Sequence, residues 1–346
     1  MRVAELAALR RFHLTEREDP AAPAPGHVQV RVASVGVCGS DLHYFSEGGI
    51  GDAACVYPMV LGHEPSGVVA KTGTGVTGWS PGDRALLEPA LYCYHCEFCL
   101  RGQHNVCAHL RFLSQPDEPG FFRDVVNLPA VNLLPLPEGM SLREGTLFEP
   151  LAVVLHSMQF AQPRPGETVV VFGAGPIGLL TIGVLRLAGA GRIWAVDPVA
   201  HRREMARAIG ADAVLDPSAG DPARTIIAET GGRGVDVAID CVGRGDSINQ
   251  SIHATRAAGR VVVTGIPGAA QITIDYHVMR RKELGFFNVR RSNHESIAAL
   301  RLLREHPARF SAMLTHARPL ERVQEAFEIL ESYSDGVGKV VVELNP

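Results

Sequence analysis

A glycine-rich turn between an apolar run and a helical stretch constrains the fold of this chain more than any other feature. Residues 168–172 are Thr-Val-Val-Val-Phe, β-branched and aromatic as in a strand, and the turn and a second apolar run follow them. Glycines in such a turn let a pyrophosphate approach a helix N-terminus, and an acidic residue ending the next strand can bind a ribose hydroxyl. The alternative is an incidental glycine turn. We expect a dinucleotide-binding site that includes Gly173, Gly175, Pro176, Ile177, Gly178 and Asp197.

The region around this turn alternates between strand-like and helix-like runs, which predicts a parallel sheet covered on both faces. Strands are expected at 168–172, 192–197, 213–216, 235–240 and 260–264. Helices are expected near 176–190, 200–210, 221–230 and 246–257, and further on at 296–304 and 320–332. The N-terminal part contains antiparallel β runs such as 27–33, and the last strand, 338–343, is expected to rejoin them.

Composition narrows the class of protein. The 346 residues are 46% hydrophobic and 20% charged, which favours a globular chain of about two domains. A net charge of −4 does not favour binding to nucleic acid or an anionic membrane, so we expect a small-molecule partner. The uncharged run 168–185 is long enough to suggest a membrane span, but its glycines fit the strand–turn–helix interpretation better. With no visible signal peptide, a soluble, cytoplasmic protein is expected.

Cysteine and histidine near residue 40 and residue 63 form a candidate metal site. Cys38, His63 and Glu64 together offer a thiolate, an imidazole and a carboxylate, a set that suits zinc with one open position. We expect Asp41 to orient His63 by accepting a hydrogen bond from its other ring N–H. The alternatives are a buried, inert Cys38 and a loop histidine with ordinary hydrogen bonds.

A second candidate metal site contains four of the seven cysteines. Cys93, Cys96, Cys99 and Cys107 can enclose one tetrahedral zinc ion with no open position, which would stabilise a small lobe. Clustering of this kind does not resemble a secreted disulfide framework and favours a reducing compartment. Free thiols or a zinc ribbon that contacts nucleic acid are the alternatives.

Glu149 precedes Pro150 at the start of a predicted helix, where an acidic residue is usually a solvated cap.

Taken together, these motifs resemble the zinc-dependent medium-chain dehydrogenases. The resemblance extends over most of the chain and is closest to the polyol branch, which includes sorbitol, xylitol and L-idonate dehydrogenases. It is carried by the motifs Cys38-Gly-Ser-Asp-Leu-His-Tyr44, Gly62-His-Glu64, the four-cysteine cluster, Glu149-Pro-Leu-Ala, and the glycine turn with Asp197.

The resemblance implies an α/β fold with a GroES-like, β-rich catalytic domain and a doubly wound Rossmann domain, with the active site in the cleft between them. We place the catalytic domain at 1–155, with a structural zinc lobe at about 90–110, the Rossmann domain at 156–290, and a returning segment at 291–346. A homotetramer or homodimer is also implied.

The resemblance further implies roles for individual residues. The catalytic zinc would be held by Cys38 and His63, with Glu64 and Glu149 as direct or water-mediated partners. Either glutamate could take the substrate proton, and Ser40 and His43 could pass it to solvent; the alternative for His43 is a surface or interface histidine. The expected reaction is hydride transfer from a secondary alcohol of a polyol, sugar or sugar acid to NAD.

Cofactor and substrate preferences rest on fewer residues. Asp197 favours NAD over NADP because its carboxylate repels a 2′-phosphate, whereas Arg202, a predicted cofactor contact, and Arg203 weaken that preference. We hypothesise that Arg290 contacts substrate hydroxyls and that Arg291 admits a carboxylate; an arginine pair at a subunit interface is the alternative.

Three aromatic residues are candidate walls of the substrate pocket, although aromatic residues are more often core. They are Tyr44, Phe112 and Phe121. Threonine or glucose dehydrogenase activity would also use the same motifs, and a protein that keeps the fold without catalysis is a further alternative.

Overall fold

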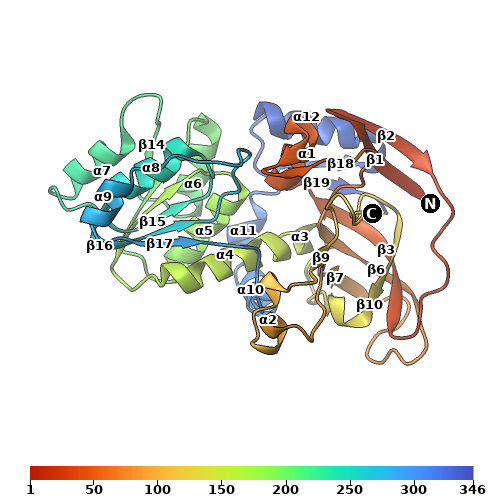
Figure 1. The fold of residues 1–346 in the computed structure, drawn as a ribbon. Coiled ribbons are helices and arrows are strands. Elements are labelled where there is room, and N and C mark those ends of the chain that lie inside the picture. Colours follow the sequence, from red (N-terminus) through yellow and green to blue (C-terminus); the bar gives the residue numbers. More distant parts are fainter. Residues whose placement is uncertain (346) are drawn as a thin grey trace. The chain divides into compact units, whose positions relative to one another are not determined.

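The computed structural model describes residues 1–345 and divides by its contacts into two compact units (Figure 1). Unit 1 contains Met1–Glu149, Leu300–Glu305 and the described residues from Leu314 onward, and unit 2 contains Pro150–Ala299 and His306–Met313. The domain boundaries predicted at 155 and 290 stay a prediction, because this division follows contacts alone.

Unit 2 is built on a six-stranded parallel sheet in the order β14-β13-β12-β15-β16-β17. The strands are β12 (Thr168–Phe172), β13 (Arg192–Val196), β14 (Ala213–Leu215), β15 (Val235–Asp240), β16 (Thr255–Val263) and β17 (Gly285–Asn288). The chain starts in the middle, proceeds to one edge and then returns to build the other. This is the strand order of dinucleotide-binding folds, with a crevice where the order reverses between β12 and β15. The predicted doubly wound sheet is confirmed.

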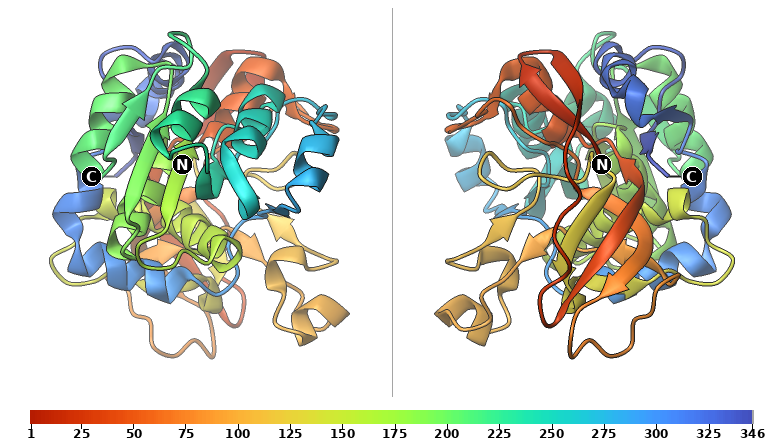
Figure 2. Two further views of the ribbon diagram at one scale, coloured as in Figure 1. Left: turned by 90° about the vertical axis from the view of Figure 1, so that its left-hand side faces the viewer. Right: turned by 90° about the vertical axis from the view of Figure 1, so that its right-hand side faces the viewer.

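Helices cover both faces of this sheet (Figure 2). One group comprises α5 (Pro176–Leu187), α6 (Ala200–Ile209) and α11 (Pro307–Ser311), and the other comprises α7 (Pro222–Glu229), α8 (Gly245–Ala254) and α9 (Tyr276–Arg281). Helix α4 (Phe148–Ala161) begins in unit 1 and continues in unit 2, whereas α10 (Ser296–Glu305) begins in unit 2 and continues in unit 1. Because both faces are covered, the middle of each central strand is apolar: Val170, Trp194 and Ala238 are almost fully buried.

Two details of unit 2 differ from the sequence-based prediction. The helix predicted to reach residue 257 ends at Ala254, and Thr255 begins β16. The β-branched Thr255 donates its hydroxyl to the carbonyl of Ser251, 2.7 Å away, and pairs with β15 before a register shift. The sixth strand, β17, was not predicted, because four residues are too short to show a period.

Unit 1 contains a seven-stranded sheet in the order β11-β7-β6-β3-β19-β18, with β10 also paired to β3. Its strands are β3 (His27–Gly36), β6 (Glu64–Thr72), β7 (Arg84–Leu87), β10 (Val125–Pro129), β11 (Leu133–Pro135), β18 (His316–Pro319) and β19 (Val340–Glu343). The C-terminal strand β19 pairs antiparallel with β3, which confirms that the end of the chain rejoins the N-terminal β material.

Short elements surround this sheet. The paired strands are β1 (Arg2–Ala8) with β2 (Arg11–Glu16), β4 (Gly49–Ile50) with β5 (Ala53–Ala54), and β8 (Ala90–Leu91) with β9 (Arg111–Phe112). The helices are α1 (Gly39–Glu47), α2 (Glu97–Leu100), α3 (Leu142–Gly145), α12 (Val323–Ser332), and the 3-10 turns His104–Val106, Ala130–Asn132 and Leu320–Arg322. The rings of Phe45 and Phe327, 5.1 Å apart, pack α1 against α12 in the unit 1 core. This packing anchors the helix that carries several predicted site residues.

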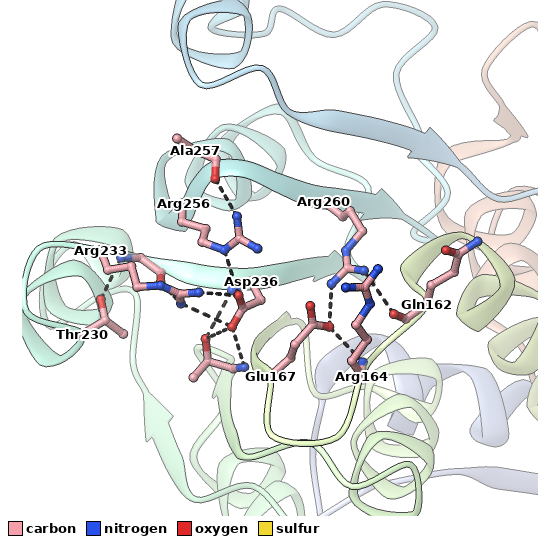
Figure 3. Close-up of polar contacts among 11 residues, drawn as sticks. Gln162, Arg164, Glu167, Thr230, Arg233, Asp236, Arg256, Ala257 and Arg260 are labelled. Atoms are coloured by element: carbon pink, nitrogen blue, oxygen red, sulfur yellow. Dashed lines mark hydrogen bonds and ion pairs between the residues drawn. The ribbon is translucent and has the colours of Figure 1, made fainter.

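A charged network closes the end of the unit 2 sheet where the strands begin (Figure 3). The buried Asp236 carboxylate accepts hydrogen bonds from the backbone N–H and hydroxyl of Thr168, at 2.9 and 2.8 Å, and from two guanidinium groups. Arg233 approaches it to 2.5 Å and Arg256 to 2.8 Å. Burial opposes ionisation of Asp236, but the two arginines and Thr168 together lower its pKa below the ordinary value. The carboxylate therefore ties three strands and a loop together.

Asp236→Asn should lower the free energy of unfolding by about 2 kcal/mol at pH 7, because hydrogen bonds to a charged group are lost. A depressed carboxylate pKa contributes stability that is present above the ordinary value of 3.8 and is lost as the pH falls further. The difference between wild type and variant should therefore shrink below about pH 4. Thermal melting across pH measures this, and Glu204→Gln, in an exposed pair with Arg207, is the control. Equal melting temperatures at pH 7 would contradict the role of the network.

Candidate metal and dinucleotide sites

The structure brings Cys38, His63 and Glu64 together at one end of the unit 1 sheet. Their ligand atoms all lie within 4.8 Å of one another. Gly36, at the end of β3, pairs with Glu64, at the start of β6, so neighbouring strands position the three side chains. One sulfur, one imidazole nitrogen and one carboxylate form a donor set that fits zinc and leaves a position open.

The His63 ring is held by a buried carboxylate, as predicted from the sequence. Its Nδ1 lies 3.2 Å from Oδ1 of Asp41, which is 1% exposed. Asp41 also accepts a hydrogen bond from the hydroxyl of Ser114 at 2.7 Å and contacts the backbone N–H groups of Gly62 and Cys38, each at 3.3 Å. Burial alone would lower the pKa of His63, but Asp41 and Cys38 raise it well above its ordinary value. The Asp41 contact leaves Nε2 as the ring atom available to a metal.

A buried lysine from the far end of the chain faces the same cluster. Lys339 forms an ion pair with Oε2 of Glu64, and the two residues are 1% and 0% exposed. Burial alone would lower the pKa of Lys339, but Glu64, Cys38 and Glu149 raise it above its ordinary value. Sequence analysis missed both Lys339 and Ser114. Neither belongs to a motif, although a lysine preceding a strand of valines is a weak signal for burial.

Glu149 lies in the first turn of α4, which begins at Phe148 rather than at Pro150. Its side chain is buried, contrary to the ordinary behaviour of a solvated helix cap. Burial raises the pKa of Glu149 to about 7; His63 opposes the shift and Glu64 adds to it. A carboxyl group with this pKa can either keep or release a proton near neutral pH.

The other residues predicted around this site have different surroundings. Ser40 Oγ lies 3.4 Å from His63 Nε2, and His43 Nδ1 lies 3.0 Å from a carboxylate oxygen of Glu47. Tyr44 and Phe121 are almost completely buried members of the unit 1 core, so their predicted role as pocket walls stays a prediction. The ring of Phe112 packs on the His63 ring, with centroids 5.5 Å apart.

The four clustered cysteines form a second group that can hold a metal ion. Three sulfur pairs lie 3.5, 3.9 and 4.0 Å apart, and all seven cysteines are unpaired by disulfides. Metal–sulfur bonds of about 2.3 Å in a tetrahedron would place the sulfurs about 3.8 Å apart. The backbone N–H of Cys99 lowers the pKa of Cys96 to about 6, which favours the thiolate that a metal requires. The geometry therefore fits structural zinc.

The glycine turn in unit 2 has the conformation that a dinucleotide requires. Gly173 has φ +86°, in the left-handed region, and a Cβ on Gly178 would lie 1.8 Å from the carbonyl oxygen of Gly173. Chain neighbours aside, the only atom of the described residues within 4 Å of an ideal Cβ on Gly175 is a guanidinium nitrogen of Arg202, at 3.8 Å. Thus the first and third glycines satisfy constraints of the fold, and Gly175 leaves room for a ligand.

Asp197 is fixed by backbone groups at the end of β13. Its two carboxylate oxygens accept hydrogen bonds from Ala174 N–H at 2.7 Å and Val199 N–H at 2.8 Å. Arg203 donates to the Asp197 carbonyl and pairs with Asp216, 3.0 Å away. The aspartate therefore also ties the glycine turn to the neighbouring strand, which the motif alone did not indicate. Arg290 is exposed and Arg291 is half-buried at φ +55°, both in unit 2.

Comparisons with known proteins identify the family. Residues 24–138 match the model of the alcohol dehydrogenase GroES-like domain, and residues 176–305 match that of the zinc-binding dehydrogenases. A probable D-xylulose reductase A of Emericella nidulans is 37% identical over 328 residues, which cover 93% of this chain and 91% of the relative. The chain belongs to the zinc-binding medium-chain dehydrogenases. The predicted family, and its polyol-dehydrogenase relatives, are thereby confirmed.

Solved structures of this family match over nearly the whole chain. L-idonate 5-dehydrogenase from Escherichia coli has a TM-score of 0.89 at 26% identity, covering 99% of this chain and 98% of that one. An E. coli alcohol dehydrogenase complexed with NADH has a TM-score of 0.88 at 27% identity, covering 99% of each chain. A dehydrogenase from Sinorhizobium meliloti bound to NADP has a TM-score of 0.88 at 28% identity, covering 99% and 98%. One of these solved structures thus holds NADH and another holds NADP.

Within residues 1–345, no helix combines the length and the apolar character that crossing a membrane requires. The apolar run that suggested a span instead forms β12, the glycine turn and part of α5.

Ser114→Ala should weaken zinc binding at the Cys38–His63 site about tenfold, because Asp41 then holds the histidine ring less firmly. Competition with a chromophoric chelator measures the affinity. Ser46→Ala, which removes a hydroxyl hydrogen bond to the Leu42 carbonyl in the same unit, is the control and should leave the affinity unchanged. An equal affinity in wild type and Ser114→Ala would show that Asp41 does not act through this hydrogen bond.

Proposed function

We propose that this zinc-binding dehydrogenase oxidises a secondary alcohol of a polyol or sugar-derived substrate with NAD. The observation that carries the proposal is the group of half-buried Cys38 with buried His63 and Glu64, one sulfur with nitrogen and carboxylate donors. This set matches an open, catalytic zinc site rather than a closed, structural one. Glu149, buried and with a raised pKa, adds a second carboxyl group to the same unit.

In this proposal each residue has a distinct task. Cys38, His63 and Glu64 hold zinc, with Glu149 as a direct or water-mediated partner, and a zinc ion bound there supplies a Lewis acid that lowers the pKa of an alcohol. Glu149 or Glu64 takes the hydroxyl proton, and a pKa near 7 suits Glu149 to this role. Ser40 and His43 pass the proton to solvent.

The remaining cysteines, Cys93, Cys96, Cys99 and Cys107, would hold a zinc ion that stabilises their lobe rather than taking part in chemistry. The lobe is visible in Figure 2 as the golden extension of the chain. A dimer or tetramer stays a prediction from the family resemblance, and a cytoplasmic location stays a prediction from the sequence.

NAD is the proposed cofactor because Asp197 carries a charge at the end of β13. The glycine turn would hold the pyrophosphate, and the Asp197 carboxylate would accept from the ribose hydroxyls and repel a 2′-phosphate. Arg202, whose guanidinium lies near Gly175, would contact the cofactor. Arg203 is engaged by Asp216, which supports NAD over NADP because that guanidinium is occupied.

The substrate class rests on the relatives. Their names include D-xylulose reductase and L-idonate 5-dehydrogenase, that is, a polyol-type and a sugar-acid activity. We propose that Arg290 contacts substrate hydroxyls and that Arg291 donates hydrogen bonds to a substrate carboxylate, since guanidinium binds carboxylates bidentately. Threonine or glucose dehydrogenase activity is the alternative, and the substrate panel described next separates them.

Wild-type protein should contain two zinc equivalents and reduce NAD with a polyol or sugar acid, followed at the nicotinamide absorbance. Cys38→Ser should contain one equivalent and lose activity by a factor on the order of 10³ or more, because the proposed open site no longer binds its metal. Cys55→Ser, a cysteine outside both groups, is the matched control and should retain both. Full zinc content and turnover in Cys38→Ser would refute the proposed site, and turnover of threonine or glucose alone would favour the alternative substrates.

Asp197→Asn keeps one acceptor oxygen for the glycine turn but removes the negative charge. The ratio of kcat/KM for NADP to that for NAD should rise about tenfold, since repulsion of the 2′-phosphate disappears. Asp212→Asn makes the same change at the other end of β13, where the carboxylate accepts from Ile193 N–H at 2.7 Å, and should leave the ratio unchanged. If the wild type uses NADP as well as NAD, the assignment is wrong.

A further inference from the structure

The ion pair between Lys339 and Glu64 is unusual for its complete burial. Among the lysines and arginines of residues 1–345, only Lys339 and Arg202 are buried. Taking two charges out of water costs several kcal/mol for each, and one ion pair recovers this cost only with good geometry and further hydrogen bonds. Glu64 Oε1 has no hydrogen-bond partner in the described chain, so the pair is incomplete as a purely structural contact.

The backbone places the pair with little freedom. Glu64 pairs with Gly36 of β3, and Gly36 in turn pairs with Val341 of β19, two residues after Lys339. The Lys339 carbonyl accepts from His316 N–H at 3.3 Å. A Cβ on Gly36 would lie 2.1 Å from Glu64 Oε2 and 3.0 Å from Lys339 Cε. The close packing of strands β3, β6 and β19 thus leaves no room for a side chain at residue 36 beside the ion pair.

The lysine also counters an excess of negative charge. Cys38, Asp41, Glu64 and Glu149 can each carry a negative charge in this part of unit 1, where the three acidic residues are at most 6% exposed. The Lys339 ammonium contacts one oxygen of one of these groups, Oε2 of Glu64. The other oxygen, Oε1, makes no hydrogen bond to the described residues and would be available to a metal ion.

We propose that Lys339 is a positioning residue of the metal centre, which holds Oε2 of Glu64 and so limits how strongly this glutamate binds the metal. The proposal rests on the proposed function, because it requires zinc at Cys38 and His63. Lys339 competes with the metal for the Glu64 carboxylate. Held in this way, Glu64 would bind a metal ion at Cys38 and His63 more weakly than an unpaired carboxylate would.

Lys339→Met removes the competing charge and keeps an unbranched side chain of similar length. Release of the catalytic zinc to a chelator should then slow on the order of tenfold, because Glu64 and the metal attract each other without an opposing cation. The apoprotein should lose stability, because Glu64 becomes an unpaired buried charge, and zinc should restore it. The gap in melting temperature between zinc-loaded and zinc-free protein should therefore widen.

The experiment measures both quantities on full-length protein. Zinc release should follow two phases, one for each proposed site, and Cys38→Ser should lack the catalytic phase. Lys282→Met is the matched control: Lys282 donates to three carbonyl groups in unit 2, so its loss should lower both melting temperatures equally and leave zinc release unchanged. Lys339→Arg keeps the charge and should release zinc within about twofold of the wild-type rate.

Two further variants keep the test decisive. Lys339→Gln, which can still donate a hydrogen bond, replaces Lys339→Met if the latter does not fold, with the same direction of change expected. In a Glu64→Gln background, Lys339→Met should no longer slow release, because the proposed effect passes through the Glu64 charge.

Zinc release that is unchanged or faster in Lys339→Met, with equal losses of melting temperature in both forms, would overturn the proposal and leave the pair a structural contact. Slower release in the Glu64→Gln background as well would also overturn it, since the lysine would then act by another route. If Cys38→Ser keeps both release phases, the proposed metal site itself fails, a result independent of any Lys339 variant.

Discussion

Burial of charge around His63 is the constraint on which unit 1 depends. Asp41, Glu64 and Glu149 are at most 6% exposed, and a carboxylate removed from water costs several kcal/mol unless it is compensated. The structure compensates two of the three with protein groups. Asp41 receives His63, Ser114 and backbone N–H groups, and Glu64 receives Lys339. Glu149 is compensated less, and its pKa rises to about 7 as a result.

The register of the paired strands decides which charged side chains meet in this cluster. Glu64 points into the cluster because it pairs with Gly36, and a shift of one residue would turn its side chain to the opposite face of the sheet. The same strand, β3, pairs on its other side with β19, which brings Lys339 from the end of the chain to a glutamate 275 positions earlier. The return of the C-terminal segment to unit 1 therefore completes the site as well as the sheet.

The sequence predicted a site best where one short segment contains all the residues of a motif. The turn from Gly173 to Gly178 and the four cysteines are local motifs, and the spacing of their residues predicts their geometry. Asp41 was identified as the partner of His63 from its place in such a motif. Ser114 and Lys339 could not be found in this way. Their contacts join residues 73 and 275 positions apart, and only the folded chain brings these residues together. The helix end at Ala254 and strand β17 were missed because tertiary pairing, rather than local periodicity, decides them.

The candidate sites of the two units differ in how far apart in the sequence their residues lie. In unit 2, the glycine turn and Asp197 form a site from consecutive elements of one βαβ unit, and Asp197 also fixes the turn through Ala174 N–H. In unit 1, the site needs β3, α1, β6, the loop that contains Ser114, and β19. The metal centre is thus the part of the account that depends most on the whole fold, and the location of its metal is the most direct test. Anomalous diffraction at the zinc absorption edge should show two peaks per chain, one among the four clustered cysteines and one that contacts Cys38 Sγ and a ring nitrogen of His63. A zinc-loaded crystal with no peak at Cys38 and His63 would contradict the account.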